Sequence, residues 1–100
     1  MPPMPKAPLL RTEEIDRLIA GLPGWERAGD TLVKKFRFTD FMEALGFVNR
    51  IADPAERMNH HPDVAIHWNE VTLTLWTHAS GGLTTKDFEL ARAIEQRAFG

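Results

Sequence analysis

The stretch VAIHWNEVTLTLWT, residues 64–77, decides the fold expected for this chain. Residues 71–77 alternate between aliphatic side chains and threonine or tryptophan, which is the period-two pattern of a half-buried strand. Residues 64–68 alternate in the same way, and Asn69-Glu70 between the two runs predicts a tight turn. The stretch therefore predicts an antiparallel hairpin with one strongly apolar face.

A second hairpin is expected earlier in the chain. Its two strands are residues 25–28 and 31–38. Gly29-Asp30 between them is typical of a turn. Leu32 and Phe36 share one side of the longer strand, and Lys34 is the exception on that side. Together the hairpins predict an antiparallel sheet with one more apolar and one more polar face.

Three segments with helical periodicity lie before, between and after the two hairpins. Thr12 can cap the first, with acidic residues in its first turn, where the helix dipole favours them. Thr39 or Asp40 can cap the second. The third is expected to run from Thr85 to about Phe99.

The middle helix contains a proline. Its expected apolar stripe is Phe41, Leu45, Val48, Ile51 and Ala52, with Phe47 beside it. Asp53-Pro54 predicts a kink or break, or else a fresh turn that begins with Pro54, because proline lacks a backbone donor. The chain should leave the helix at His60-His61-Pro62, since the residue before a proline prefers extended geometry.

The element order is thus α-β-β-α-β-β-α. It predicts an α+β fold: a two-layer sandwich of a four-stranded antiparallel sheet with three helices on one face. The 100 residues suit one domain. We expect residues 1–11 to be a flexible proline-rich lead-in and residues 12–100 to form the domain.

Composition narrows the classes of function. The formal net charge is −2, without the clustered basic face that nucleic-acid binding usually needs, so no nucleic-acid partner is expected. The absence of cysteine excludes disulfides, thiolate catalysis and cysteine-ligated zinc. No apolar run is long enough to span a membrane and no signal core is present, so a cytoplasmic protein is expected.

All four histidines lie between residues 60 and 78. Histidine exchanges protons near neutral pH, which suits acid/base catalysis. His60 and His61 leave the middle helix in different directions, and His78 at the end of a strand can close on them. We expect these three imidazoles to gather in one cleft, whereas His67 is interpreted as a surface residue.

Two carboxylates can orient these imidazoles. Glu56 lies four residues before His60 and shares its face if the helix persists that far. Asp87, at the start of the last helix, can orient His78 or act only as a helix cap. A carboxylate beside a histidine fixes its tautomer.

Two alternatives stand beside this interpretation. Histidines also bind zinc, but no H-E-x-x-H or similar spacing is present, so we expect no metal site. Trp68 and Trp76 are, by residue type alone, more typical of a core or an interface than of a ligand platform.

The segment from residue 56 to residue 87 reads E-x3-H-H-P-x5-W-x9-H-x8-D. Its fixed positions are Glu56, His60, His61, Pro62, Trp68, His78 and Asp87. This segment, with the run THASGGLTTKD at residues 77–87, resembles the pterin-4a-carbinolamine dehydratase family. The likeness extends from about Leu18 to Gln96. Pro54 departs from the family pattern, where a helix-forming residue is usual.

The resemblance implies a specific activity. Members of the family are hydro-lyases that dehydrate 4a-hydroxytetrahydropterins to quinonoid dihydropterins, which supports tetrahydrobiopterin recycling, and they need no metal or organic cofactor. It implies that His60, His61 and His78 are catalytic and that Trp68 walls the pterin pocket. Glu56 and Asp87 would orient imidazoles. It also implies a homodimer or homotetramer.

The resemblance leaves one further role open. Some members bind a transcription factor and stabilise its dimer, so a protein-binding module without required catalysis is the alternative. An exposed apolar helix face would serve that role, and Phe41, Leu45 and Phe47 are its candidates. A zinc-dependent hydrolase is the third hypothesis.

Overall fold

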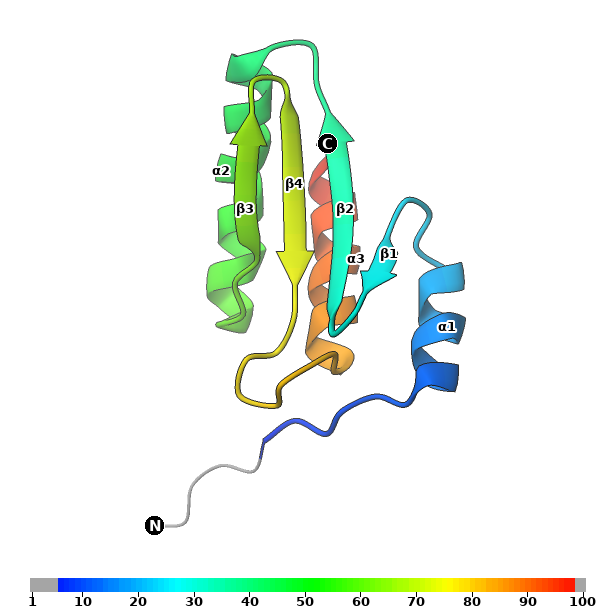
Figure 1. Ribbon diagram of the computed structural model, residues 1–100. Coiled ribbons are helices and arrows are strands. Elements are labelled where there is room, and N and C mark those ends of the chain that lie inside the picture. Colours follow the sequence, from blue (N-terminus) through cyan, green and yellow to red (C-terminus); the bar gives the residue numbers. More distant parts are fainter. Residues whose placement is uncertain (1–5, 99–100) are drawn as a thin grey trace.

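The computed structural model describes residues 6–98. Its elements are α1 (Thr12–Ala20), β1 (Glu26–Ala28), β2 (Thr31–Arg37), α2 (Phe41–Met58), β3 (Asp63–His67), β4 (Glu70–Leu75) and α3 (Thr85–Ala98), as Figure 1 shows. The predicted order of helices and strands is therefore confirmed.

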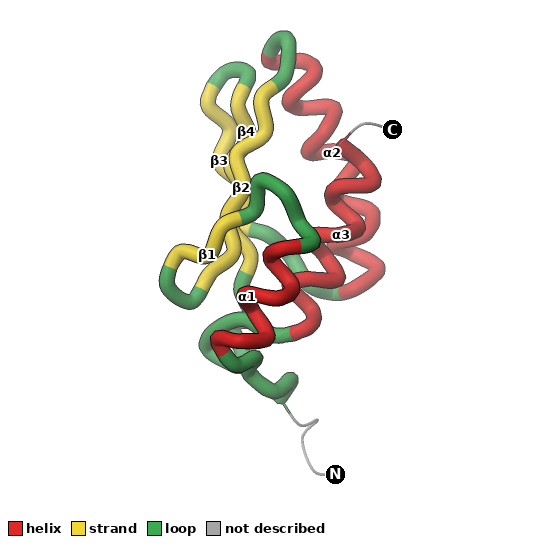
Figure 2. The backbone as a smooth tube through the Cα atoms, turned by 90° about the vertical axis from the view of Figure 1, so that its right-hand side faces the viewer, coloured by secondary structure: helices red, strands yellow, loops and turns green. Residues whose placement is uncertain are grey.

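The strands form one antiparallel sheet in the order β1-β2-β4-β3. Figure 2 shows all three helices on the same face of this sheet. The predicted two-layer α+β sandwich is confirmed. No described helix has the length and apolar character that crossing a membrane requires.

The alternation in β2 and β4 builds the core. Leu32 pairs with Leu75 and Phe36 with Val71, and all four side chains are buried beneath the helices. Lys34 lies on the same face, and its amine is satisfied there because it donates hydrogen bonds to the Pro23 carbonyl and the Glu95 carboxylate. The amine thus reaches polar partners at the edge of the apolar layer.

The cap of α1 and the turn between β3 and β4 differ from the sequence expectation, whereas the cap of α2 agrees with it. Helix α1 is capped at Arg11 and not at Thr12, because the Arg11 amide donates to the Glu14 carboxylate at 3.1 Å. Asp40, one of the two candidates, caps α2 by accepting a hydrogen bond from the Glu43 amide. The turn between β3 and β4 is Trp68-Asn69, one residue earlier than expected.

Helix α2 runs unbroken through Pro54 to Met58, so the predicted break is wrong. Its fully buried stripe is Ala44, Phe47, Ile51 and Ala55, together with Pro54. The expected stripe is therefore displaced by about one residue around the helix, and Phe41 is 45% exposed. The Phe47 ring packs on Phe36 and Phe38, with ring centroids 4.8 and 5.0 Å away.

The chain before α1 touches the loop that follows β4. The Leu10 amide donates to the Leu83 carbonyl at 2.9 Å, and the Ser80 hydroxyl donates to the Ala7 carbonyl at 2.6 Å. The flexible lead-in expected at residues 1–11 falls partly on residues 1–5, which lie outside the described residues.

Candidate active site

The three candidate histidines come from two connections at one end of the sheet. Asn59 ends α2 in a left-handed conformation, with φ of 49°, and His60 and His61 follow it into β3. His78 lies three residues after β4 ends at Leu75. Because β3 and β4 are antiparallel, the start of β3 and the end of β4 lie at the same end of the sheet.

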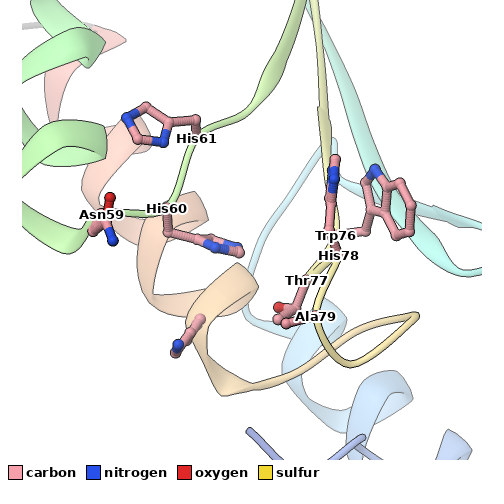
Figure 3. A pocket seen from close by; sticks show the side chains of 8 residues that line it. Asn59, His60, His61, Trp76, Thr77, His78 and Ala79 are labelled. Carbon is pink, nitrogen blue, oxygen red and sulfur yellow. The ribbon is translucent and has the colours of Figure 1, made fainter. Parts of the chain in front are cut away.

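A cavity of about 310 Å³ brings the three imidazoles together. Its lining residues are Asn59, His60, His61, Trp76, Thr77, His78, Ala79 and Lys86. In Figure 3 the His60 ring extends across toward the strand that carries His78, whereas the His61 ring turns back toward α2. The structure thus gathers the predicted histidines around one pocket.

His60 is held by a buried carboxylate. Its Nε2 atom lies 2.6 Å from Oδ1 of Asp87. The His60 side chain is 11% exposed and the Asp87 side chain 0% exposed. Oδ2 of Asp87 accepts the Thr77 hydroxyl at 2.8 Å and the Thr84 amide at 2.9 Å. Asp87 therefore completes the capping box of α3 by accepting the Thr84 amide, and it is also the partner of His60.

His61 is held by a different carboxylate. Its Nε2 atom is hydrogen-bonded to Oε2 of Glu56, and both side chains are more than half exposed. The two carboxylates therefore serve other histidines than the sequence predicted, which were His60 for Glu56 and His78 for Asp87. The left-handed turn at Asn59 ends the helical spacing, so His60 swings away from Glu56 toward α3 and His61 takes its place.

His78 rests on an aromatic ring. The rings of Trp76 and His78 stack with centroids 3.9 Å apart and planes inclined by 29°. Figure 3 shows the indole on the far side of His78 from His60. Strand parity is the signal that could have found Trp76, because residues two apart near a strand end lie on the same side.

Trp68 lies far from this pocket. It sits in the β3–β4 turn, which Figure 1 places at the opposite end of the sheet from the loop after β4. It is 66% exposed and has a φ of 55°. The expected wall of the pocket is thus not Trp68 in this chain, because β3 carries the backbone away from His61 toward that turn.

Sequence reasoning also missed three polar or charged lining residues: Asn59, Thr77 and Lys86. Thr77 alternates away from Trp76 and His78 and is 5% exposed, so only the fold reveals its contact with Asp87. Within residues 6–98, no group of three or more histidine, cysteine, aspartate or glutamate side chains is arranged to hold a metal ion.

Comparison with known proteins agrees with this geometry. The family model described as "Pterin 4 alpha carbinolamine dehydratase" matches residues 8–97. The chain belongs to this family. The predicted resemblance is therefore confirmed, and it extends beyond the segment of residues 18–96 that first indicated it.

Curated relatives of this dehydratase family cover about nine-tenths of the chain. A protein of Thermosynechococcus vestitus named "Putative pterin-4-alpha-carbinolamine dehydratase" is 48% identical over 89 residues, which is 89% of this chain and 94% of that protein. A Cyanothece protein of the same name is 49% identical over 90 residues, 90% of this chain and 93% of its own length.

Two solved structures share the fold. A Brucella melitensis protein titled as a transcriptional coactivator/pterin dehydratase has a TM-score of 0.87 and 32% identity, covering 91% of this chain and 99% of its own. A pterin dehydratase-like protein titled as a RuBisCO assembly factor in the alpha-carboxysome has a TM-score of 0.60 and 20% identity. It covers 74% of this chain and 86% of its own, and that likeness concerns the fold alone.

Proposed function

We propose that this protein is a hydro-lyase that dehydrates a 4a-hydroxytetrahydropterin to the quinonoid dihydropterin and water. The observation that carries the proposal is the convergence of His60, His61 and His78 on one pocket, two of them bonded to a carboxylate. Family membership supports the reaction type, and the pocket supplies groups that can move the protons it requires.

The reaction needs one proton removed and one delivered. The ring nitrogen next to the carbinol carbon loses its proton, and the electron pair forms a carbon–nitrogen double bond as the carbon–oxygen bond breaks. The leaving hydroxyl takes up a proton and departs as water. His60 and His61 form the acid/base pair, and His78 binds the substrate or shares the proton transfer. Each such transfer is worth roughly 10²–10⁴-fold in rate.

The two carboxylates act through the histidines. Asp87 and Glu56 each occupy the Nε2 atom of one imidazole, so Nδ1 is the nitrogen of His60 and of His61 that remains for the substrate. A fixed ring orientation keeps the proton-transfer atom in place while the substrate binds. Trp76 replaces Trp68 as the aromatic residue of this site, because it backs His78 from the sheet side.

The decisive test is the rate of 4a-carbinolamine dehydration, followed by ultraviolet absorbance. We expect catalysis by the wild-type protein and a loss of roughly 10²-fold or more in His61→Ala. His67→Ala is the matched control, because His67 lies at the far end of β3. A folded wild-type protein without catalysis would overturn the proposal, and a partner-binding role would become the better account.

The physiological role that we propose is tetrahydrobiopterin recycling in the cytoplasm. A hydroxylase that oxidises a tetrahydropterin leaves the 4a-hydroxy product, and this protein would return that product to the reducible quinonoid form. Growth that depends on an aromatic amino-acid hydroxylase should then slow when the gene is deleted. Normal growth and a normal tetrahydropterin pool in the deletion strain would contradict this role.

We also propose self-association as a homodimer or homotetramer. Strand β3 is an edge of the sheet, and its Val64 side chain is 42% exposed. Beside it a cavity of about 330 Å³ is lined mainly by apolar residues of α2 and by Pro62 and Val64. An open edge beside apolar surface favours pairing with another strand. Light scattering during gel filtration will give the number of subunits, and a monomeric mass would refute this proposal.

The exposed apolar face of α2, which the protein-binding alternative requires, is smaller than the sequence indicated. Phe47 is fully buried, so it cannot contribute to an exposed face, whereas Phe41 and Met42 at the start of α2 are 45% and 73% exposed. Among the solved structures with this fold, the Brucella melitensis protein is described as a transcriptional coactivator and the carboxysome protein as a RuBisCO assembly factor. A stoichiometric protein partner together with absent dehydratase activity would favour this alternative.

A further inference from the structure

A chain of buried threonine hydroxyls lies behind the Asp87–His60 pair. The Thr84 and Thr77 hydroxyl oxygens are 2.7 Å apart, and the Thr77 hydroxyl lies 2.8 Å from Oδ2 of Asp87. At the other end, the Lys86 amide donates to the Thr84 hydroxyl oxygen at 3.2 Å. Thr77, Thr84 and Asp87 are 5%, 0% and 0% exposed.

The contacts allow one consistent direction for the protons. An ionised carboxylate only accepts, so the Thr77 hydroxyl must donate to Asp87. Each hydroxyl carries a single proton, so Thr84 must donate to Thr77 and accept from the Lys86 amide. Every buried side-chain nitrogen and oxygen among residues 6–98 finds a partner. The network is therefore closed, and a closed buried network holds its members in one arrangement.

The proton on His60 also has one position that fits these contacts. With Oδ2 of Asp87 occupied by the Thr77 hydroxyl and the Thr84 amide, Oδ1 faces Nε2 of His60. Because the carboxylate only accepts, Nε2 of His60 carries a proton and donates it. In the neutral ring Nδ1 is then the unprotonated nitrogen, and it is the one left for the pocket.

We propose that the Thr77 and Thr84 hydroxyl groups position His60 through Asp87 and so set which nitrogen of His60 exchanges protons in the pocket. Thr77 has a second link, because its backbone pairs with Gly82 and accepts from the Ser80 and Gly81 amides. It thereby ties the loop of His78 to the partner of His60. Thr77 and Thr84 are positioning residues, and their catalytic consequence rests on the dehydratase function proposed above.

The first test is independent of activity. Two-bond ¹H–¹⁵N spectra of the labelled protein, with the His60 signals assigned by comparison with His60→Gln, report the tautomer. We expect the Nε2–H form in the wild-type protein. Thr77→Val keeps the shape but loses the hydroxyl that holds Oδ2 of Asp87, so the carboxylate can turn away from Nε2, and we expect a mixture of the two neutral forms. A wild-type His60 in the Nδ1–H form would overturn the proposal without any variant.

The second test separates positioning from stability. We expect kcat to fall about tenfold or more in Thr77→Val, with little change in KM, and to return to within about threefold in Thr77→Ser, which restores the hydroxyl. Thr74→Val is the control, since Thr74 pairs with Val33 and Asp63 on the sheet face away from the helices. Equal kcat values for Thr77→Val and the wild type would overturn the proposal.

The two readouts also keep this proposal distinct from the function. A tautomer change in Thr77→Val, in a protein that shows no dehydration, would support the positioning of His60 and refute the dehydratase. Active wild-type protein with an unchanged tautomer and rate in Thr77→Val would support the dehydratase and refute the positioning of His60 by Thr77. If Thr77→Val does not fold, Thr84→Val interrupts the same proton chain one step earlier, and an unaltered tautomer there would overturn the proposal.

Discussion

His60 and Asp87 are 27 residues apart in the sequence, and Nε2 of the histidine lies 2.6 Å from Oδ1 of the aspartate. The contact joins the segment that follows α2 to the first turn of α3. It also unites a helix cap with a catalytic candidate, because the same carboxylate accepts the Thr84 amide. A change at Asp87 should therefore lower both the stability of the fold and the catalytic rate, and the two effects can be measured separately.

Asp87→Asn should lower activity strongly, although the two side chains are nearly equal in size. The amide oxygen can still accept from Thr77 and Thr84, but the amide nitrogen then faces His60 as a donor and imposes the opposite tautomer. We expect kcat/KM to fall by roughly 10²-fold or more, as a reversed tautomer does in other histidine–carboxylate pairs. The free energy of unfolding should fall by about 1–3 kcal/mol. Near-normal turnover would contradict the assigned contact.

Glu56→Gln should lower the dehydration rate while leaving the stability almost unchanged. The carboxylate of Glu56 is 75% exposed and its partner His61 is 54% exposed, so the pair adds little to stability. We expect urea unfolding to change by less than about 0.5 kcal/mol, while the dehydration rate falls about tenfold because the His61 ring loses its orientation. Urea unfolding and the dehydration rate, measured on one preparation of the variant, check both expectations. An unchanged rate would remove Glu56 from the site.

The fold was predictable from the sequence because periodicity and turns agree with each other. The alternation in residues 71–75 places Val71, Leu73 and Leu75 in the core, and all three are fully buried. The pairing of histidines with carboxylates was not predictable. It depends on the left-handed residue Asn59 and on how α3 docks beside it, and neither follows from residue spacing.

Trp68 illustrates the same limit. Ten residues separate it from His78, and a motif read along the chain treats both as members of one site. The hairpin sends them to opposite ends of the sheet. Trp76 is two residues from His78, so strand alternation places both side chains on the same side, where their rings stack. The spacing of a motif does not encode this alternation.

The pH dependence of stability should carry a contribution from Glu70. The Arg37 guanidinium, followed by the Lys35 amine, donates hydrogen bonds that hold the pKa of Glu70 below its ordinary value. A lowered folded pKa means that the stabilisation is complete above the ordinary value and is lost as the pH falls through the folded value. In Glu70→Gln this part of the acid loss should disappear.

Urea midpoints at pH 7 and at pH 3 will measure the effect of Glu70. The wild type should exceed Glu70→Gln by a small margin at pH 7, and the margin should shrink at pH 3. The margin is small because solvent screens this ion-paired cluster. Glu89→Gln, at an exposed position of α3, is the control. A margin that grows on acidification would show that the assigned sign is wrong.

Trp76 and Trp68 offer a direct test of which tryptophan serves the site. Trp76 stacks on His78 and lines the pocket, and such aromatic pairs are worth about 0.5–1.5 kcal/mol. We expect Trp76→Leu to raise KM for the pterin or lower kcat by about three- to tenfold, with partial recovery in Trp76→Phe. Trp68→Leu should leave both constants unchanged, because its turn is remote from the pocket within one chain. Steady-state kinetics on the three variants decide the matter: loss of activity at Trp68 with none at Trp76 would mean that a second copy of the chain brings Trp68 to the histidines.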